Sequence, residues 1–188
     1  MPKPLLIIIT GPPCTGKTTL GRRIASEFYM PFLNKDSIKE LLFDSLGWSD
    51  RAWSKKLGLA SYALLYYFLD IQLKAGISLI VESNFHPTID IEKFLALLEK
   101  YDFQPLQIMC QTEGTILFQR FKVRAESGER HPGHVDALSY EEFRAVLLRG
   151  KFDPLALGGT VIEVDTTDFS KINYEGLYEA IRSSNDSR

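Results

Sequence analysis

The chain has 188 residues, of which 45% are hydrophobic and 24% charged, and its formal net charge is −2. This length supports one hydrophobic core and is short for two, so we expect a single domain over residues 1–188, and the net negative charge disfavours nucleic acid as a partner. No apolar run approaches the roughly 18 residues that span a bilayer, and no segment has the pattern of a signal peptide. The two cysteines have no metal-site spacing and suit a reducing compartment. We therefore expect a cytoplasmic protein without membrane contact.

The first predicted element is a buried strand over Leu5–Ile9, an aliphatic run that is typical of a parallel sheet. It leads into Gly11–Thr18, which matches the phosphate-loop pattern GxxxxGK followed by Ser or Thr. Glycines let the backbone N–H groups approach phosphate oxygens, while Lys17 reaches the β- and γ-phosphates and the Thr18 hydroxyl binds Mg²⁺. The sequence therefore predicts binding of ATP and Mg²⁺. We expect the nucleotide to contact Gly11, Cys14, Thr15, Gly16, Lys17, Thr18 and Thr19.

A helix is predicted directly after this loop, because Leu20, Ile24 and Phe28 recur at helical spacing. The partial positive charge of its first turn lies where the phosphates would bind. A short strand over residues 31–34 comes next, and Asp36 follows it.

Asp36 has two possible roles. A carboxylate here can accept the proton of a hydroxyl group and orient that group during phosphoryl transfer. Alternatively, Asp36 caps a helix over Ser37–Phe43, where aspartate is favoured, and its position alone does not decide between the two. Lys39, one turn later, either binds an anion of the substrate or is a solvated surface lysine, and its spacing by itself favours the solvated lysine.

A long helix over Trp53–Ala75 and a strand over Ser78–Val81 are predicted next, followed by a helix over Asp90–Lys100. Glu82 closes the strand as the acidic residue of a Walker B strand does, so we expect it to bind Mg²⁺ together with Thr18, with a helix cap or a structural ion pair as the alternative. We expect one apolar face of the long helix to hold Leu57, Ala60, Leu64, Phe68 and Ile71.

A fourth strand within Pro105–Cys110 precedes a helix that begins near Glu113. Arg120 and Arg124 are four residues apart on this helix and project from the same face. Such arginines can stabilise the charge of a transferring phosphoryl group, although a surface pair has the same spacing. A polar segment over about 125–137 follows, which we expect to be a mobile cover that excludes water and carries Arg130 toward the phosphates.

The chain ends with a helix over Tyr140–Leu148, a fifth strand over Thr160–Val164 and a last helix over Tyr174–Ile181. This alternation of strands and helices predicts an α/β fold with a parallel sheet and helices on both faces. Ligands of such sheets bind beyond the carboxyl ends of the strands. Asn84 and Asp165 follow two of the predicted strands, so they are further candidates for ligand contact.

These motifs make the chain similar to the predicted kinases of the P-loop superfamily, AAA-type ATP-binding proteins that include polynucleotide kinase, zeta toxins, chloramphenicol phosphotransferase and gluconate kinase. Asp36 with Lys39 resembles their DxxR element, with Lys in place of Arg, and the pair of Arg120 and Arg124 resembles their lid-side RxxxR element. The resemblance implies a nucleotide-kinase-like P-loop fold with strand order 2-3-1-4-5. It also implies that Asp36 is the base, that the arginines hold ATP phosphates, and that Asp165 lies near the adenine.

The expected activity is transfer of the γ-phosphate of ATP·Mg²⁺ to a hydroxyl group of a small molecule. A kinase of polynucleotide 5′-hydroxyl groups and a non-kinase ATPase that acts as a nucleotide-dependent switch remain alternatives, and the sequence indicates no oligomeric state. The expected catalytic residues are Lys17, Asp36, Arg120, Arg124 and Arg130. On the substrate side we expect Asp36, Lys39 and Asn84. The chain departs from the family pattern at Lys39 and at Glu82-Ser83-Asn84, and because both departures lie on this side of the site, the sequence leaves the acceptor undefined.

Overall fold

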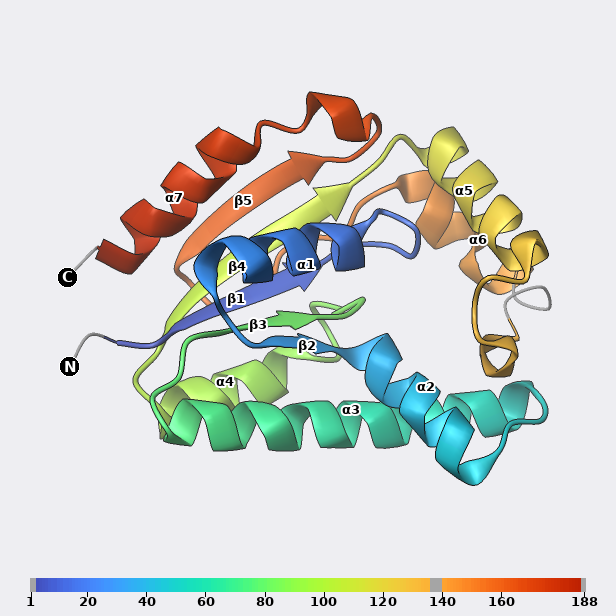
Figure 1. Cartoon of the computed structure of the whole chain (residues 1–188), viewed down its shortest axis with the longest axis horizontal. Helices are drawn as coiled ribbons and strands as arrows, with labels where there is room; N and C mark the ends of the chain where they lie inside the picture. The colour runs from blue at the N-terminus through green and yellow to red at the C-terminus, as the bar shows by residue number, and fades with distance from the viewer. Residues whose placement is uncertain (1–2, 136–139, 187–188) are drawn as a thin grey trace.

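A five-stranded parallel sheet forms the centre of the molecule, in a computed structural model that describes residues 3–135 and 140–186 (Figure 1). The strand order β2-β3-β1-β4-β5 confirms the expected order and the α/β P-loop fold. The strands are β1 (Leu5–Thr10), β2 (Phe32–Asn34), β3 (Leu79–Glu82), β4 (Gln104–Gln111) and β5 (Thr160–Asp165). The helices are α1 (Lys17–Phe28), α2 (Lys35–Leu46), α3 (Arg51–Lys74), α4 (Ile91–Lys100), α5 (Gly114–Ser127), α6 (Tyr140–Arg149) and α7 (Tyr174–Asp186), with 3-10 turns η1 (Pro132–His134) and η3 (Phe169–Lys171).

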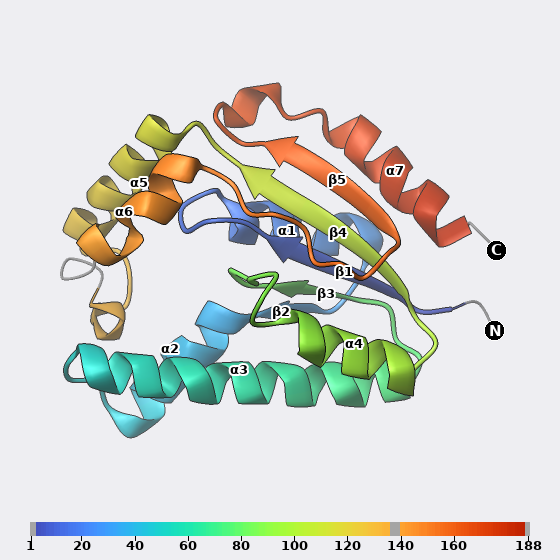
Figure 2. The same ribbon diagram turned by 180° about the vertical axis from the view of Figure 1, so that it is seen from behind.

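Helices cover the sheet on both faces, as Figures 1 and 2 show from opposite sides. On one face, Ile7 of β1 packs in a cluster with Ile24 of α1 and Ile181 of α7. On the other face, Ile8 packs in a second cluster with residues of α3 and α4. All six residues of β1 are buried, because this strand lies at the centre of the sheet between two helical layers. Within the described residues, no helix combines the length and the apolarity needed to cross a membrane.

The apolar face predicted for α3 is correct at Leu57 and wrong further along the helix. Phe68 and Ile71 were expected to be buried, but their exposed fractions are 39% and 43%. The buried row is instead Ser54, Leu57, Ser61, Leu65, Leu69 and Leu73. Both rows combine steps of three and four residues, as helical faces do, so periodicity alone cannot choose between them. The choice depends on which row meets the sheet and α4.

The carboxyl ends of β1, β2 and β3 lie together at one edge of the sheet, where α1 and α2 begin. Gly11, which follows β1, has a φ of 148°, and a Cβ built on it would lie 2.2 Å from the Cys110 carbonyl oxygen of β4. Only glycine lets the chain pass this close to the neighbouring strand and turn into the loop. The same edge therefore brings the phosphate loop, Glu82 and the start of α2 into one region.

Candidate active site

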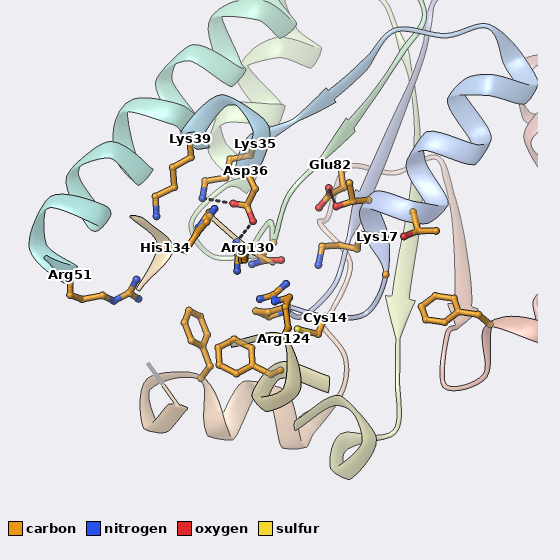
Figure 3. Close-up of a pocket in the computed structure, with 18 residues that line it drawn as sticks. Cys14, Lys17, Lys35, Asp36, Lys39, Arg51, Glu82, Arg124, Arg130 and His134 are labelled. Atoms are coloured by element: carbon orange, nitrogen blue, oxygen red, sulfur yellow. Dashed lines mark hydrogen bonds and ion pairs between the residues drawn. The ribbon is translucent and has the colours of Figure 1, made fainter. Parts of the chain in front are cut away.

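A pocket of about 410 Å³ lies at this edge of the sheet (Figure 3). It collects side chains from the phosphate loop, α2, α3, the end of β3, α5 and the segment that follows α5. Of the residues predicted from the sequence, it is lined by Cys14, Gly16, Lys17, Thr18, Thr19, Asp36, Lys39, Glu82, Asn84, Arg124 and Arg130. Residues that the sequence analysis did not place in a site also line it, namely Pro13, Lys35, Arg51, Phe121, His134, Phe143 and Phe169.

Lys17 lies in the concave side of the phosphate loop, and its side chain is 6% exposed. Its ammonium group donates a hydrogen bond of 2.7 Å to the Pro12 carbonyl oxygen, and the Thr15 hydroxyl donates one of 2.9 Å to the same atom. Burial lowers the pKa of Lys17, and the charge of Glu82 counteracts this. Thr15 thus holds the shape of the loop without lining the pocket, while Lys17 faces the space in which a phosphate would bind.

Thr18 and Glu82 meet beside Lys17. The Thr18 hydroxyl donates a hydrogen bond of 2.8 Å to Glu82 Oε2, and the Asn34 side-chain amide donates to the same oxygen. Glu82 is 4% exposed, and this burial raises its pKa although Lys17 and the two donors oppose the shift. Two hard oxygen donors facing a phosphate site fit Mg²⁺, which keeps most of its ligands as water and phosphate oxygens. Among residues 3–135 and 140–186, no cluster of three or more His, Cys, Asp and Glu side chains offers a complete protein-built metal cage.

Asp36 is not the cap of α2. That helix begins at Lys35, and the Asn34 side chain caps it by accepting a hydrogen bond of 2.7 Å from the Ser37 backbone N–H. Asp36 lies in the first turn, where its carboxylate accepts hydrogen bonds from Lys35 at 3.1 Å and from Arg130 at 2.5 Å (Figure 3). Burial raises the pKa of Asp36, but the charges of Lys35, Arg130 and His134 outweigh it and hold the pKa far below its ordinary value.

Lys39 is buried, contrary to the solvated lysine that its spacing favoured. Its exposed fraction is 5%, and its ammonium group donates a hydrogen bond of 2.9 Å to the Ser54 hydroxyl of α3. Burial, followed by the positive charge of Lys35, lowers the pKa of Lys39 to about 8. Sequence spacing missed this because the burial depends on how α3, the next helix along the chain, packs against α2.

The two arginines of α5 do not converge on one group. Arg124 lines the pocket, whereas the Arg120 guanidinium donates hydrogen bonds of 2.9 and 2.8 Å to the carbonyl oxygens of Thr166 and Thr167 after β5. Arg120 also lies 4.9 Å from the centre of the Phe169 ring. The structure therefore places Arg120 beside the pocket wall that Phe169 forms, and it places Arg124 in the pocket itself.

Two further predicted contacts lie away from the pocket lining. Gly11 follows β1 at the base of the loop, and its role is the close approach to Cys110 described above. Asp165 is exposed, accepts a hydrogen bond of 2.8 Å from the Thr167 backbone N–H, and lines a separate surface cavity next to Arg149. Phe169 is the aromatic residue at the pocket on this side, and its place shortly after β5 was the one available signal for it.

The predicted cover over 125–137 is partly helical and partly packed against α2. Residues 125–127 belong to α5, and residues 136 and 137 lie outside the described residues. Between them, His134 hydrogen-bonds to Glu40 at 2.9 Å and His131 to Asp44 at 3.2 Å. These contacts hold Arg130 next to Asp36, so the segment reaches the pocket as expected while resting on α2.

The contact between Gly133 and Phe43 gives a test of this packing. A Cβ on Gly133 would lie 2.7 to 2.8 Å from ring atoms of Phe43, which is 1% exposed and cannot move aside. We expect Gly133→Ala to lower the free energy of unfolding by about 1–3 kcal/mol, as overpacking does, and to speed amide hydrogen exchange across residues 130–135. Urea denaturation and hydrogen exchange measured by mass spectrometry provide the two readouts.

Gly58 in α3 is a matched control for this substitution. A Cβ there would make ordinary contact at 3.7 Å with the Lys39 side chain. Gly58→Ala should therefore raise the stability by about 0.5–1 kcal/mol, because alanine is the better helix former. Equal stability of the Gly133→Ala variant and the wild type would show that the segment does not rest on Phe43.

Comparison with known proteins gives one family and several related folds. Residues 6–149 match the model of the AAA domain family. A crystal structure from Chloroflexus aurantiacus, described as a "putative kinase", is 41% identical, with the alignment covering 97% of this chain and 98% of that chain at a TM-score of 0.89. A gluconokinase from Sinorhizobium meliloti (14% identical, 98% and 95% covered, TM-score 0.53) and a sugar kinase from Janibacter (16% identical, 98% and 95% covered, TM-score 0.55) share the fold. A search among curated proteins gave no match.

Proposed function

We propose that the chain, which belongs to the AAA domain family of P-loop proteins, is a kinase that transfers the γ-phosphate of ATP to a hydroxyl group of a small molecule. The observation that carries this proposal is that Lys17, Asp36 and Arg124 line one pocket. A P-loop protein that only hydrolyses its nucleotide needs no space for a second substrate beyond the phosphates. Here the pocket extends from the phosphate loop to α2 and α3, and Asp36 lies in that additional space.

Phosphoryl transfer depends on position and charge, because its transition state spreads negative charge over the three oxygens of the transferring group. Lys17 and the loop N–H groups would bind the β- and γ-phosphates. Arg124 and Arg130, which enter the pocket from α5 and from the segment after it, would stabilise the charge of the transferring group. Thr18 and Glu82 are the residues that would hold Mg²⁺, which neutralises phosphate charge when it is bound.

Asp36 would orient the acceptor. Because Lys35 and Arg130 hold its pKa low, it stays ionised and accepts a hydrogen bond from the acceptor hydroxyl. As the bond between that oxygen and the γ-phosphorus forms and the bond to ADP breaks, the hydroxyl proton moves to Asp36 and then to solvent. The loose transition state requires this transfer only late, which suits a carboxylate that is a weak base.

The experiment that tests this function follows label from γ-labelled ATP and Mg²⁺ into a panel of small hydroxyl compounds, with a 5′-hydroxyl oligonucleotide included. We expect label on at least one small acceptor, and no transfer from the same ATP by the Lys17→Met variant. Label on the oligonucleotide alone would support the polynucleotide kinase. Release of phosphate without any labelled acceptor across the panel would support the nucleotide-dependent switch.

A further inference from the structure

Positive charge exceeds negative charge in the pocket. Six cationic side chains line it, at Lys17, Lys35, Lys39, Arg51, Arg124 and Arg130, against the carboxylates of Asp36 and Glu82. In the proposed kinase function, the phosphates of ATP would bind next to Lys17 and Arg124. The cations of α2 and α3 lie on the other side of Asp36, away from Lys17 (Figure 3), where the acceptor would bind.

Most of the cations around Asp36 and Lys39 have a carboxylate partner. Lys35 and Arg130 are paired with Asp36. Arg51, at the start of α3, is paired with Glu142 of α6 at 2.9 Å. Lys35 and Arg130 thus share one carboxylate, and Glu142 also pairs with Lys55, so each of these cations has an ion-pair partner although the cluster keeps a net positive charge.

Lys39 differs from them. It forms no ion pair with any residue in the part of the chain that the structure describes, and its hydrogen bond goes to the neutral hydroxyl of Ser54. Its exposed fraction is only 5%, yet it lines the pocket. Burial of an ammonium group without an ion-pair partner is unfavourable unless an anion compensates its charge.

The surroundings of Lys39 add positive charge. Lys35 and Asp36 are on its own helix, Arg51 and Ser54 on α3, and Arg130 and His134 on the segment after α5. Of these, Lys35, Arg51 and Arg130 all oppose the charge of Lys39, and Asp36 alone favours it. Nearby cations that disfavour a buried ammonium favour an anion bound beside it.

We propose, on the basis of the proposed kinase function, that the phosphate acceptor carries its own anionic group, a carboxylate or a phosphate, and that Lys39 binds this group. The acceptor is then a small hydroxy acid or a phosphorylated alcohol. Lys39 binds its anion at the α3 side of the pocket while Asp36 orients its hydroxyl toward the γ-phosphate. A neutral polyol would leave the charge of Lys39 uncompensated.

Binding of simple anions tests this site without relying on transfer. The full chain is saturated with a non-hydrolysable ATP analogue and Mg²⁺, so that the phosphate loop is occupied, and then titrated by calorimetry with sulfate and with acetate. We expect one of these anions to bind the wild type, and to bind the Lys39→Met variant at least tenfold more weakly. Preference for sulfate indicates a phosphorylated acceptor, and preference for acetate indicates a hydroxy acid.

Two further variants separate this role from a structural one. Lys122→Met removes an exposed lysine of α5 and should leave anion binding unchanged. Lys39→Met should keep or raise the thermal midpoint, because it removes a buried charge, whereas loss of a structural contact would lower the midpoint. Equal anion binding by the Lys39→Met variant and the wild type, or no binding of either anion to the wild type, would overturn the proposal.

The protonation of Lys39 gives a pH dependence with a defined sign. With a pKa of about 8, Lys39 is charged below that pH and becomes neutral above it. We expect acetate or sulfate binding to weaken as the pH rises through this range, and to weaken much less in Lys39→Arg, because arginine stays charged. A wild-type affinity that does not change across this range would contradict the assignment.

Failure of this inference and failure of the kinase function have different signatures. If the ATP analogue binds and label passes to neutral polyols but not to their carboxylate or phosphate counterparts, the kinase stands and the anionic acceptor is wrong. If label passes to no acceptor of either kind while ATP is hydrolysed, the kinase function itself is wrong. Transfer to a 5′-hydroxyl oligonucleotide alone would replace the small acceptor by a nucleic acid.

Discussion

Lys17→Met should reduce phosphoryl transfer by at least about 10²-fold, since removal of one preorganised group that stabilises transition-state charge costs on the order of 10²–10³. Lys17 is the cation of the phosphate loop, it is almost fully buried, and its ammonium group is oriented by the Pro12 carbonyl oxygen. Methionine preserves the length and the apolar stem of the side chain. The loss therefore reflects the missing charge and not a collapse of the loop.

Single-turnover transfer of label from γ-labelled ATP measures this effect, with circular dichroism and thermal unfolding to check the fold. We expect a thermal midpoint equal to or above that of the wild type, because burial disfavours the charged form of Lys17. Lys122→Met serves as the control, since it removes an exposed lysine and should transfer at the wild-type rate. Transfer by Lys17→Met within tenfold of the wild type would remove the phosphate loop from the active site.

The features of this molecule that the sequence predicted are those set by local chemistry. A short aliphatic run followed by a glycine-rich loop and a helix fixes β1, the phosphate loop and α1, because each of these depends on residues close in the chain. The strand order was implied by the resemblance to P-loop kinases, and the observed sheet has this order. Glu82 could be placed because the carboxyl ends of parallel strands meet at one edge of a sheet.

The features that the sequence did not predict depend on contacts that helical spacing within one element does not encode. Asn34 caps α2 in place of Asp36, and this leaves the Asp36 carboxylate directed into the pocket and paired with Arg130, which lies 94 positions further along the chain. Lys39 is buried where α3 lies beside α2, with its ammonium group bonded to Ser54 of α3. Spacing placed Arg120 and Arg124 on one helix face, but the carbonyl groups after β5 bind Arg120 and separate the two.

Asp36→Asn should lower the rate of transfer by roughly 10²–10⁴, the range for loss of a positioned general base. Asparagine keeps the shape of the side chain, but its amide cannot take the hydroxyl proton and cannot compensate the charges of Lys35 and Arg130. Binding of a non-hydrolysable ATP analogue should change little, because the phosphate loop is untouched. Asp102→Asn, which alters an exposed ion pair with Lys3, is the control and should retain full activity.

The pH dependence of the wild type distinguishes this role further. The folded-state pKa of Asp36 lies below its ordinary value, so the carboxylate is ionised above about pH 5 and its contribution is lost only as the pH falls toward the folded-state pKa. We therefore expect kcat to show no acid limb from Asp36 between about pH 5 and 7. If kcat falls with an apparent pKa in that range, and the fall disappears in Asp36→Asn, then Lys35 and Arg130 do not hold the carboxylate in its ionised form during turnover. If Asp36→Asn transfers phosphate at the wild-type rate, Asp36 serves only to anchor Arg130 on α2.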